Sequence, residues 1–438
     1  MSKKNIVLIF VAAMLLSSCG IYKKFEPVSD TRQETKADEE RHFGDMQWSE
    51  VFTDPQLQAL IEKALQNNAD LQKSHLAVQQ MEASLKASKL AYMPSVGFNP
   101  GTTFTGVEST STDEYMIPVA LDWQIDIFGR ATTAKRKANA LTEEYRDLEQ
   151  ATRAELIAAV AKVYYSLSMI DNQTKVVTNT IAIREKALET QKALMMAGHV
   201  NSAAVSQFNA ELCAAKVQLV NLQKQFNEVR NSLSILIKEN IDEIQCGSMD
   251  VAFPEIGNVE VSSINLLSRP DVRASQHALE AAFYAERGTV AEYWPNIGIS
   301  ASTGFNPDNF VWSVVGSLFQ PIFQRGQLNA NRKIAAAQQE QARLDFEKAL
   351  FTASVDIDNA LCSLKTANDA AVLYKEQEAH YQDAFDATNE LMKHGQGSYL
   401  EVLFAQQALL ESSLMKIAND YDAICSMITL YLALGGGN

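Results

Sequence analysis

The feature that most constrains this fold is a pair of very long segments that contain neither glycine nor proline. One runs from 131 to 197 and the other from 327 to 394, and after each glycine break a second such segment follows. Both residues disfavour helix interiors, so their absence permits helices of unusual length. Each of the two longest segments would reach roughly 100 Å at 1.5 Å per residue. The sequence predicts long helices over about 131–197, 199–240, 327–394 and 398–434.

The chain is also a duplicated unit. Tyr92 and Pro94 recur as Tyr293 and Pro295, each displaced by 201 residues (293 − 92). Further on, Gly198 recurs as Gly395, displaced by 197 (395 − 198), which predicts a shorter strand hairpin in the second copy. A period near 200 is too long for a solenoid repeat. We therefore expect two half-molecules, 46–265 and 266–438, each with a helix, two strands, a very long helix, a glycine break and a second long helix.

Alternating residues predict strands between these helices, over about 96–127 in the first repeat and about 297–323 in the second. From 117 to 127 every odd position is apolar, and Asp122, Gln124 and Asp126 stand between them. This pattern is typical of a half-buried soluble sheet and of a transmembrane β-barrel alike. Four strands cannot close a barrel, and lipid does not tolerate open edges, so membrane-spanning strands would require several chains.

The N-terminus has the features of an export signal with a lipid attachment site. Lys3 and Lys4 precede an apolar run from 6 to 16, and Leu16-Ser17-Ser18-Cys19 follows. We predict a signal peptide over 1–18, a covalent lipid on Cys19 and a polar tether over 19–45. The alternative is an ordinary signal peptide with a chance cysteine. Gly20 after the cysteine favours sorting to the outer membrane.

Composition excludes several classes of function. The net charge of −15 argues against nucleic acid as a partner, because phosphate binding needs clustered lysine and arginine. The spacings of the remaining cysteines fit no zinc site, and we expect buried free thiols, although an exported protein can also form disulfides. These are Cys213, Cys246, Cys362 and Cys425. No catalytic motif, metal site or cofactor other than the lipid is expected, so the chain is predicted not to be an enzyme.

The ordered motifs together resemble the TolC-like outer-membrane efflux family, in its OprM-type lipoprotein branch. They are the lipobox at Cys19, the junctions Tyr92-Met93-Pro94 and Tyr293-Trp294-Pro295, Asp126-Ile127-Phe128-Gly129-Arg130, Pro321-Ile322-Phe323, the turn 395–403 and the ending 430–437. The resemblance implies an α+β membrane protein: a homotrimer with a twelve-stranded β-barrel, a long-helix periplasmic α-barrel and a mixed equatorial belt formed by residues near 47–56, 241–263 and the C-terminus. It further implies a periplasmic membrane-fusion adaptor, an inner-membrane resistance-nodulation-division pump and export of drugs or other small solutes.

The same resemblance identifies candidate residues of a pore gate. Gly198 and Gly395 would lie in the turns at the periplasmic tip, and Glu401 falls on an acidic position of the family. Phe404 stands where the family usually has an aspartate, and Ala204 replaces an acid in the first repeat. The hypothesis is that Phe404 closes the pore and Glu401 sets ion preference. The alternative for Glu401 is a solvated helix carboxylate.

Two other functions stay open from the sequence. A type I secretion channel for polypeptides would share the architecture, so that only its partners and cargo distinguish it. A structural coiled-coil lipoprotein would explain the helices and the lipobox, but it would leave the alternating strands without a purpose.

Overall fold

The computed structural model of the 438-residue chain describes most of it. The described residues are 23–27, 43–98, 101–107, 110–116, 119–241, 244, 246–249, 266–306, 309–320, 322–394 and 396–437. Cys19, Gly395 and most of the predicted 241–263 belt segment lie outside them. The chain divides into two compact units, and each draws on both sequence repeats. The first consists mainly of Ser74–Glu149 and Pro270–Leu350, and the second mainly of Gln150–Arg269 and Phe351–Asn438.

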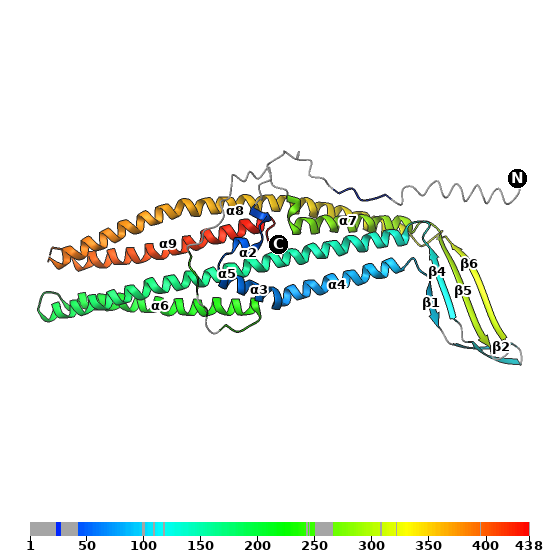
Figure 1. Cartoon of the computed structure of the whole chain (residues 1–438), viewed down its shortest axis with the longest axis horizontal. Helices are drawn as coiled ribbons and strands as arrows, with labels where there is room; N and C mark the ends of the chain where they lie inside the picture. The colour runs from blue at the N-terminus through cyan, green and yellow to red at the C-terminus, as the bar shows by residue number, and fades with distance from the viewer. Residues whose placement is uncertain are drawn as a thin grey trace. The chain divides into compact units, whose positions relative to one another are not determined.

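The first unit contains the strands. Its main sheet has the order β1-β4-β5-β6 with every neighbouring pair antiparallel, and β2 pairs with β3 in a separate hairpin (Figure 1). The strands are β1 (Ser95–Phe98), β2 (Gly101–Val107), β3 (Thr110–Met116), β4 (Val119–Ile125), β5 (Asn296–Asn306) and β6 (Asn309–Phe319). Most of α4 (Ala69–Leu90), all of α7 (Pro270–Ala291) and the first parts of α5 and α8 belong to the same unit.

The first strand hairpin differs from the prediction of two strands over 96–127. The structure divides that stretch into four strands, because β1 and β4 join the main sheet whereas β2 and β3 form a ladder with each other. The β4–β5 ladder begins at Val119, opposite Thr303, although β5 continues to Asn306. The first hairpin is also the longer one, so its outer part extends past the ladder of the main sheet.

The second unit is built from two long helical hairpins. Helix α5 (Arg130–Met196) precedes α6 (Ser202–Ile237), and α8 (Gln327–Lys393) precedes α9 (Tyr399–Ala433). Its described residues also form two short helices, α2 (Trp48–Val51) and α3 (Pro55–Asn67), and two 3-10 turns, η2 (Phe43–Asp45) and η4 (Leu266–Ser268). Among the described helices, none combines the length and the apolar character that crossing a lipid bilayer requires.

A mixed core joins the N-terminal helices to the long hairpins of this unit. Leu57 and Ile61 of α3 pack with Tyr165 of α5 and with Leu233 and Ile237 of α6. The hydroxyl of Tyr164 donates to Asp54 Oδ2 at 2.6 Å and accepts from the Gly247 amide at 3.0 Å. Burial next to the Asp54 carboxylate raises the pKa of Tyr164, because both disfavour the phenolate.

The cysteine prediction is wrong in part. Cys213 and Cys362 are exposed on the helix surfaces, whereas Cys246 and Cys425 are half-buried, and all four are free thiols. A helical position does not by itself bury a side chain, because one face of each long helix points away from the core.

Candidate functional site

The two helical hairpins turn in the same way. At the first turn, Gly198 has a left-handed φ of +78°, and the His199 amide donates to the Leu194 carbonyl at 2.9 Å. At the second turn, the equivalent Gln396 amide donates to the Leu391 carbonyl at 2.9 Å. At the first turn this bond closes the end of α5 through Gly198, and glycine is strongly favoured at such a positive φ. Gly395 itself lies outside the described residues.

The helices that follow the two turns begin with different caps. Asn201 Oδ1 accepts from the Ala204 amide at 3.0 Å at the start of α6. At the start of α9, Ser398 caps the Leu400 amide, and Glu401 Oε2 accepts from the Ser398 amide at 3.2 Å. Glu401 therefore has a local role in a capping box, which the sequence pattern Ser-x-x-Glu signals. Its carboxylate is exposed, whereas Ala204 at the equivalent place is buried.

Phe404 lies on the exposed face of the first turns of α9 in the single chain. Its side chain is 72% exposed, although its neighbours Val402 and Leu403 are buried. The ring of Tyr399 packs against Phe208 of α6, with centroids 6.2 Å apart. An aromatic ring left this exposed has a large apolar surface available for other contacts.

A buried arginine near the same end of the bundle was missed from the sequence. Arg184 of α5 is only 2% exposed, and it donates to the Glu211 carbonyl of α6 at 2.6 Å and to Gln407 Oε1 of α9 at 2.8 Å. Its Nε has no hydrogen-bond partner among the described residues, and burial lowers the pKa of the guanidinium. Its burial could have been predicted from its position in the apolar stripe of α5, between Ile181 and Leu188.

A second polar cluster joins α5 and α7 in the first unit. Asp147 accepts from Arg273 Nε at 2.9 Å and lies 3.6 Å from His277 Nε2, while Glu280 lies 3.3 Å from His277 Nδ1. The bond to Glu280 and the nearby Asp147 raise the pKa of His277, although burial opposes them. Burial also raises the pKa of Glu144. Among the described residues no set of three His, Cys, Asp or Glu side chains is arranged to hold a metal ion.

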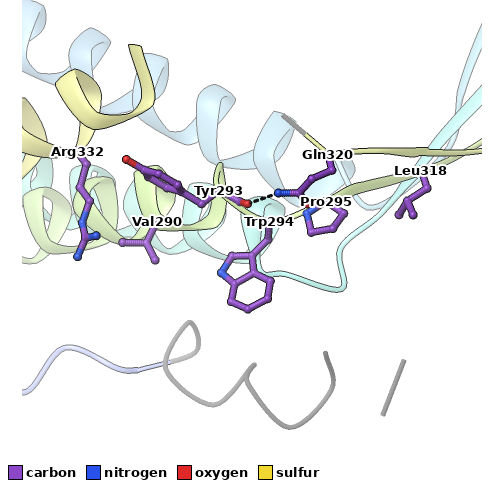
Figure 2. A pocket seen from close by; sticks show the side chains of 7 residues that line it. All are labelled: Val290, Tyr293, Trp294, Pro295, Leu318, Gln320 and Arg332. Carbon is purple, nitrogen blue, oxygen red and sulfur yellow. Dashed lines mark hydrogen bonds between the residues drawn. The ribbon is translucent and has the colours of Figure 1, made fainter. Parts of the chain in front are cut away.

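The helix-to-strand junctions of the first unit are a further distinctive feature. In the second repeat, Gln320 Nε2 donates to the Tyr293 carbonyl at 2.8 Å (Figure 2). The Tyr293 hydroxyl donates to Asn329 Oδ1 at 2.8 Å. A pocket of about 620 Å³ opens beside this junction. Its lining residues are Val290, Tyr293, Trp294, Pro295, Leu318, Gln320 and Arg332.

Comparisons with known proteins agree with this architecture. The family model described as "Outer membrane efflux protein" matches residues 60–237 and 261–436, one stretch in each repeat. The cation efflux system protein CusC of Escherichia coli is 26% identical, with 98% of each chain covered. The probable outer membrane lipoprotein SilC of Salmonella typhimurium is 25% identical over 90% of this chain and 89% of its own. The outer membrane channel MtrE of Neisseria gonorrhoeae, solved in its open state, has a TM-score of 0.84 at 25% identity, covering 95% of this chain and 97% of that one.

These similarities extend over nearly the whole chain and include the strands and the long helices. They confirm the predicted fold class, the outer-membrane location extending into the periplasm, and a function as an efflux channel and not an enzyme. Because a single family model matches both repeats, the chain belongs to the outer membrane efflux protein family.

Proposed function

We propose that three copies of this chain form a homotrimeric exit duct that receives small solutes from a resistance-nodulation-division pump through a membrane-fusion adaptor. The main observation in support of a trimer is that the main sheet is open. Its outer strands β1 and β6 each pair on one side only within the described sheets. In lipid an open strand edge leaves backbone groups unsatisfied, and small barrels need about eight strands. Three copies of a four-stranded sheet supply twelve strands.

Exposed apolar side chains on the sheet support a lipid environment for it. Val96, Phe98, Trp312, Val314 and Leu318 are all exposed in the single chain. The mass of the protein in detergent tests the assembly, and we expect three chains per particle. A stable monomer under native mass spectrometry would overturn the proposal.

The cargo proposal follows the names of the relatives. CusC belongs to a cation efflux system, and a passive duct serves whatever its pump delivers. Deletion of the gene is expected to sensitise cells to metal cations or to small organic toxicants, and the intact gene is expected to restore resistance. If the deletion instead blocks secretion of a polypeptide and leaves these sensitivities unchanged, the channel serves type I secretion. Purification of the trimer after in vivo cross-linking tests for the adaptor and the pump.

A lipid on Cys19 is proposed on the order of the N-terminal signals and on the lipoprotein name of SilC. The thioether to diacylglycerol would hold the tether at the inner leaflet of the outer membrane. We expect metabolic labelling with palmitate to be lost in Cys19→Ala, while Cys213→Ala keeps it. Undiminished labelling of Cys19→Ala would place the lipid elsewhere.

At the tip, we propose that Phe404 narrows the pore and that Glu401 gives it cation preference. Around a threefold axis each side chain becomes a ring of three, and an aromatic ring of this kind can close a passage by excluding water. The exposure of both side chains supports this, as does their position after the turn that contains Gly395.

Planar-bilayer recordings of the isolated trimer test the gate. Phe404→Ala is expected to raise single-channel conductance, and Glu401→Gln is expected to weaken cation selectivity with little change in conductance. Gln207→Ala, at the position equivalent to Phe404 in the first repeat, is the matched control. If both variants conduct and select like the parent protein, neither side chain lines the constriction.

A further inference from the structure

The main sheet has one apolar face and one polar face. In the β4–β5 and β5–β6 ladders, Ile297 pairs with Ile125 on one side and with Leu318 on the other, so these three side chains share a face. The same registers add mainly apolar residues to that face, among them Val96, Leu121, Trp123, Ile299, Trp312 and Val314. The opposite face carries Asp122 and Ser300, whose side chains are hydrogen-bonded at 2.7 Å. Because the chain is an outer-membrane channel, the apolar face is the one that suits contact with lipid.

The pocket beside Tyr293 opens at the helix end of this apolar face. Its lining includes Leu318 of β6, which belongs to the apolar face and is 66% exposed in the single chain. Trp294, between the end of α7 and the start of β5, also lines it and stacks on Phe128, with ring centroids 5.2 Å apart. Since the long helices extend into the periplasm, this end of the strands lies at the inner leaflet of the outer membrane, among its lipid headgroups.

The helix side of the pocket is positively charged. Arg332 of α8 lines it, and its Nε lies 4.0 Å from Glu286 Oε1, while Arg287 Nε lies 3.6 Å from Glu286 Oε2. Two arginines therefore share one carboxylate, which leaves an excess of one positive charge in this group. The Arg287 guanidinium lies 5.2 Å from the centroid of the Phe283 ring, whereas the Arg332 side chain is 57% exposed. Figure 2 shows Arg332 and Leu318 at opposite ends of the lining residues, so the pocket has a cationic end and an apolar end.

We propose that this pocket binds a glycerophospholipid of the inner leaflet, with Arg332 on its phosphodiester and an acyl chain along Trp294 and Leu318. A guanidinium offers paired N–H donors whose geometry matches phosphate oxygens. Tryptophan and tyrosine rings favour the depth of the lipid headgroups, because they combine an apolar body with a polar tip. The apolar end of the pocket continues into the sheet face that contacts lipid, so the acyl chain stays in apolar surroundings. The volume of about 620 Å³ is within the range of small-molecule sites.

The equivalence of the two repeats extends to the strand register. Ser95 pairs with Asp122 in the β1–β4 ladder, and the residues displaced by 201 and 197 are Asn296 and Phe319, which pair in the β5–β6 ladder. Because register decides which face every side chain occupies, the junction of the first repeat can be compared with the pocket residue by residue.

The first repeat has different chemistry at the equivalent place. The equivalent of Gln320 is Trp123 (320 − 197), whose indole donates to the Tyr92 carbonyl at 2.9 Å. The equivalent of Arg332 is Lys135 (332 − 197), whose ammonium lies 5.8 Å from the centroid of the Tyr92 ring. A lysine lacks the planar fork of donors that an arginine offers to phosphate. We therefore expect one tight phospholipid site per chain, in the second repeat.

Native mass spectrometry of the purified protein tests the site, with dioleoylphosphatidylglycerol added to the detergent solution in increasing amounts. We expect the first equivalent per chain to bind tightly. Arg332→Gln is expected to weaken this binding about tenfold, because the phosphate loses charge-assisted hydrogen bonds. Lys348→Gln removes one positive charge from the same helix, 16 residues (348 − 332) farther from the strands. It is the matched control, and we expect it to bind the lipid like the parent protein.

A second pair of variants tests the pocket without changing its charge. Val290→Phe adds volume to the lining, so we expect a smaller fraction of chains to hold the lipid. Val220→Phe makes the same substitution at an exposed position of α6 and is expected to leave that fraction unchanged. Circular dichroism of all four variants checks that they fold like the parent protein.

Dioleoylglycerol, which has the same acyl chains and no phosphate, separates headgroup recognition from binding of the chains alone. We expect it to bind the parent protein about tenfold more weakly than dioleoylphosphatidylglycerol. It also represents the diacylglycerol proposed on Cys19, so equal binding of the two lipids would assign the pocket to acyl chains such as those of the anchor and overturn the proposal. Unchanged phosphatidylglycerol binding by Arg332→Gln or by Val290→Phe would overturn it too. A monomeric particle that keeps the expected differences would overturn the proposed trimer and leave the lipid site standing.

Discussion

The two repeats share a backbone plan but differ in the side chains that stabilise it. At the start of α5, Asp126 accepts from the Ala131 and Thr132 amides at 3.0 and 2.8 Å. The equivalent residue before α8 is Phe323, whose side chain is 83% exposed. Both repeats nevertheless keep the same strand register and the same turn hydrogen bonds. Duplication has preserved the backbone pairing, and the side chains have diverged where the repeats meet different neighbours.

The largest expected difference between the repeats concerns Arg184, whose equivalent in α8 is the half-buried Tyr381. Arg184→Ala removes a buried side chain and the donors for Gln407 and the Glu211 carbonyl, and we expect a loss of about 2–4 kcal/mol in stability. Thermal denaturation followed by circular dichroism measures it. Tyr381→Ala is expected to cost less. Arg184→Met, which keeps the side-chain volume without a charge, is expected to recover much of the lost stability. Equal losses of stability for Arg184→Ala and Arg184→Met would show that the hydrogen bonds of Arg184, and not its volume, stabilise the protein.

The next largest expected effect on stability concerns helix capping at the two strand-to-helix junctions. Asp126→Ala is expected to destabilise the protein by about 1 kcal/mol, because two amides of the first turn of α5 lose their acceptor. Phe323→Asp is expected to raise the thermal midpoint by supplying α8 with the cap that its counterpart has. Asp358→Ala, in the interior of α8, is the control for a lost carboxylate. A Phe323→Asp protein that melts below the parent would show that the ring contributes more than the cap.

The pH dependence of stability distinguishes the repeats through His277, because the equivalent residue in α4 is Leu76. Its pKa is raised in the folded protein, so its contribution to stability is present below the unfolded value of about 6.5. That contribution is lost as the pH rises through the folded pKa. Asp147, Glu280, Glu143 and Glu144 are the acidic groups around it, and Arg273 is bonded to Asp147 in the same cluster. We expect the thermal midpoint of the parent to fall more than that of His277→Gln between pH 6 and 8; parallel curves would contradict this.

What the sequence predicted depends on whether a property is local or shared between distant segments. The long helices and the strands were predicted from local patterns, because missing glycines and prolines permit long helices and alternation marks strands. The family, the fold class and the function were predicted from the resemblance that the ordered short motifs carry. The exposure of Cys213 and Cys362 was mispredicted, because helix position alone does not say which face is covered. The Arg184 contacts were missed because Gln407 is 223 residues away. The first hairpin is divided into four strands at the point where the β4–β5 ladder ends. That point depends on pairing between distant segments, so the local sequence pattern does not predict it.

The smallest expected effect lies at the tips, and it separates the local role of Glu401 from its proposed role in the pore. Glu401→Gln keeps a side chain that can accept from the Ser398 amide and loses the charge that favours a helix N-terminus, so we expect a cost of about 0.3–0.5 kcal/mol. Asn201→Ala, in the first repeat, loses the acceptor itself and is expected to cost about 1 kcal/mol. Thermal midpoints of both variants measure this order. If Glu401→Gln costs more than Asn201→Ala, the carboxylate makes a contact at the tip beyond the capping box, and the assembled trimer is where that contact would form.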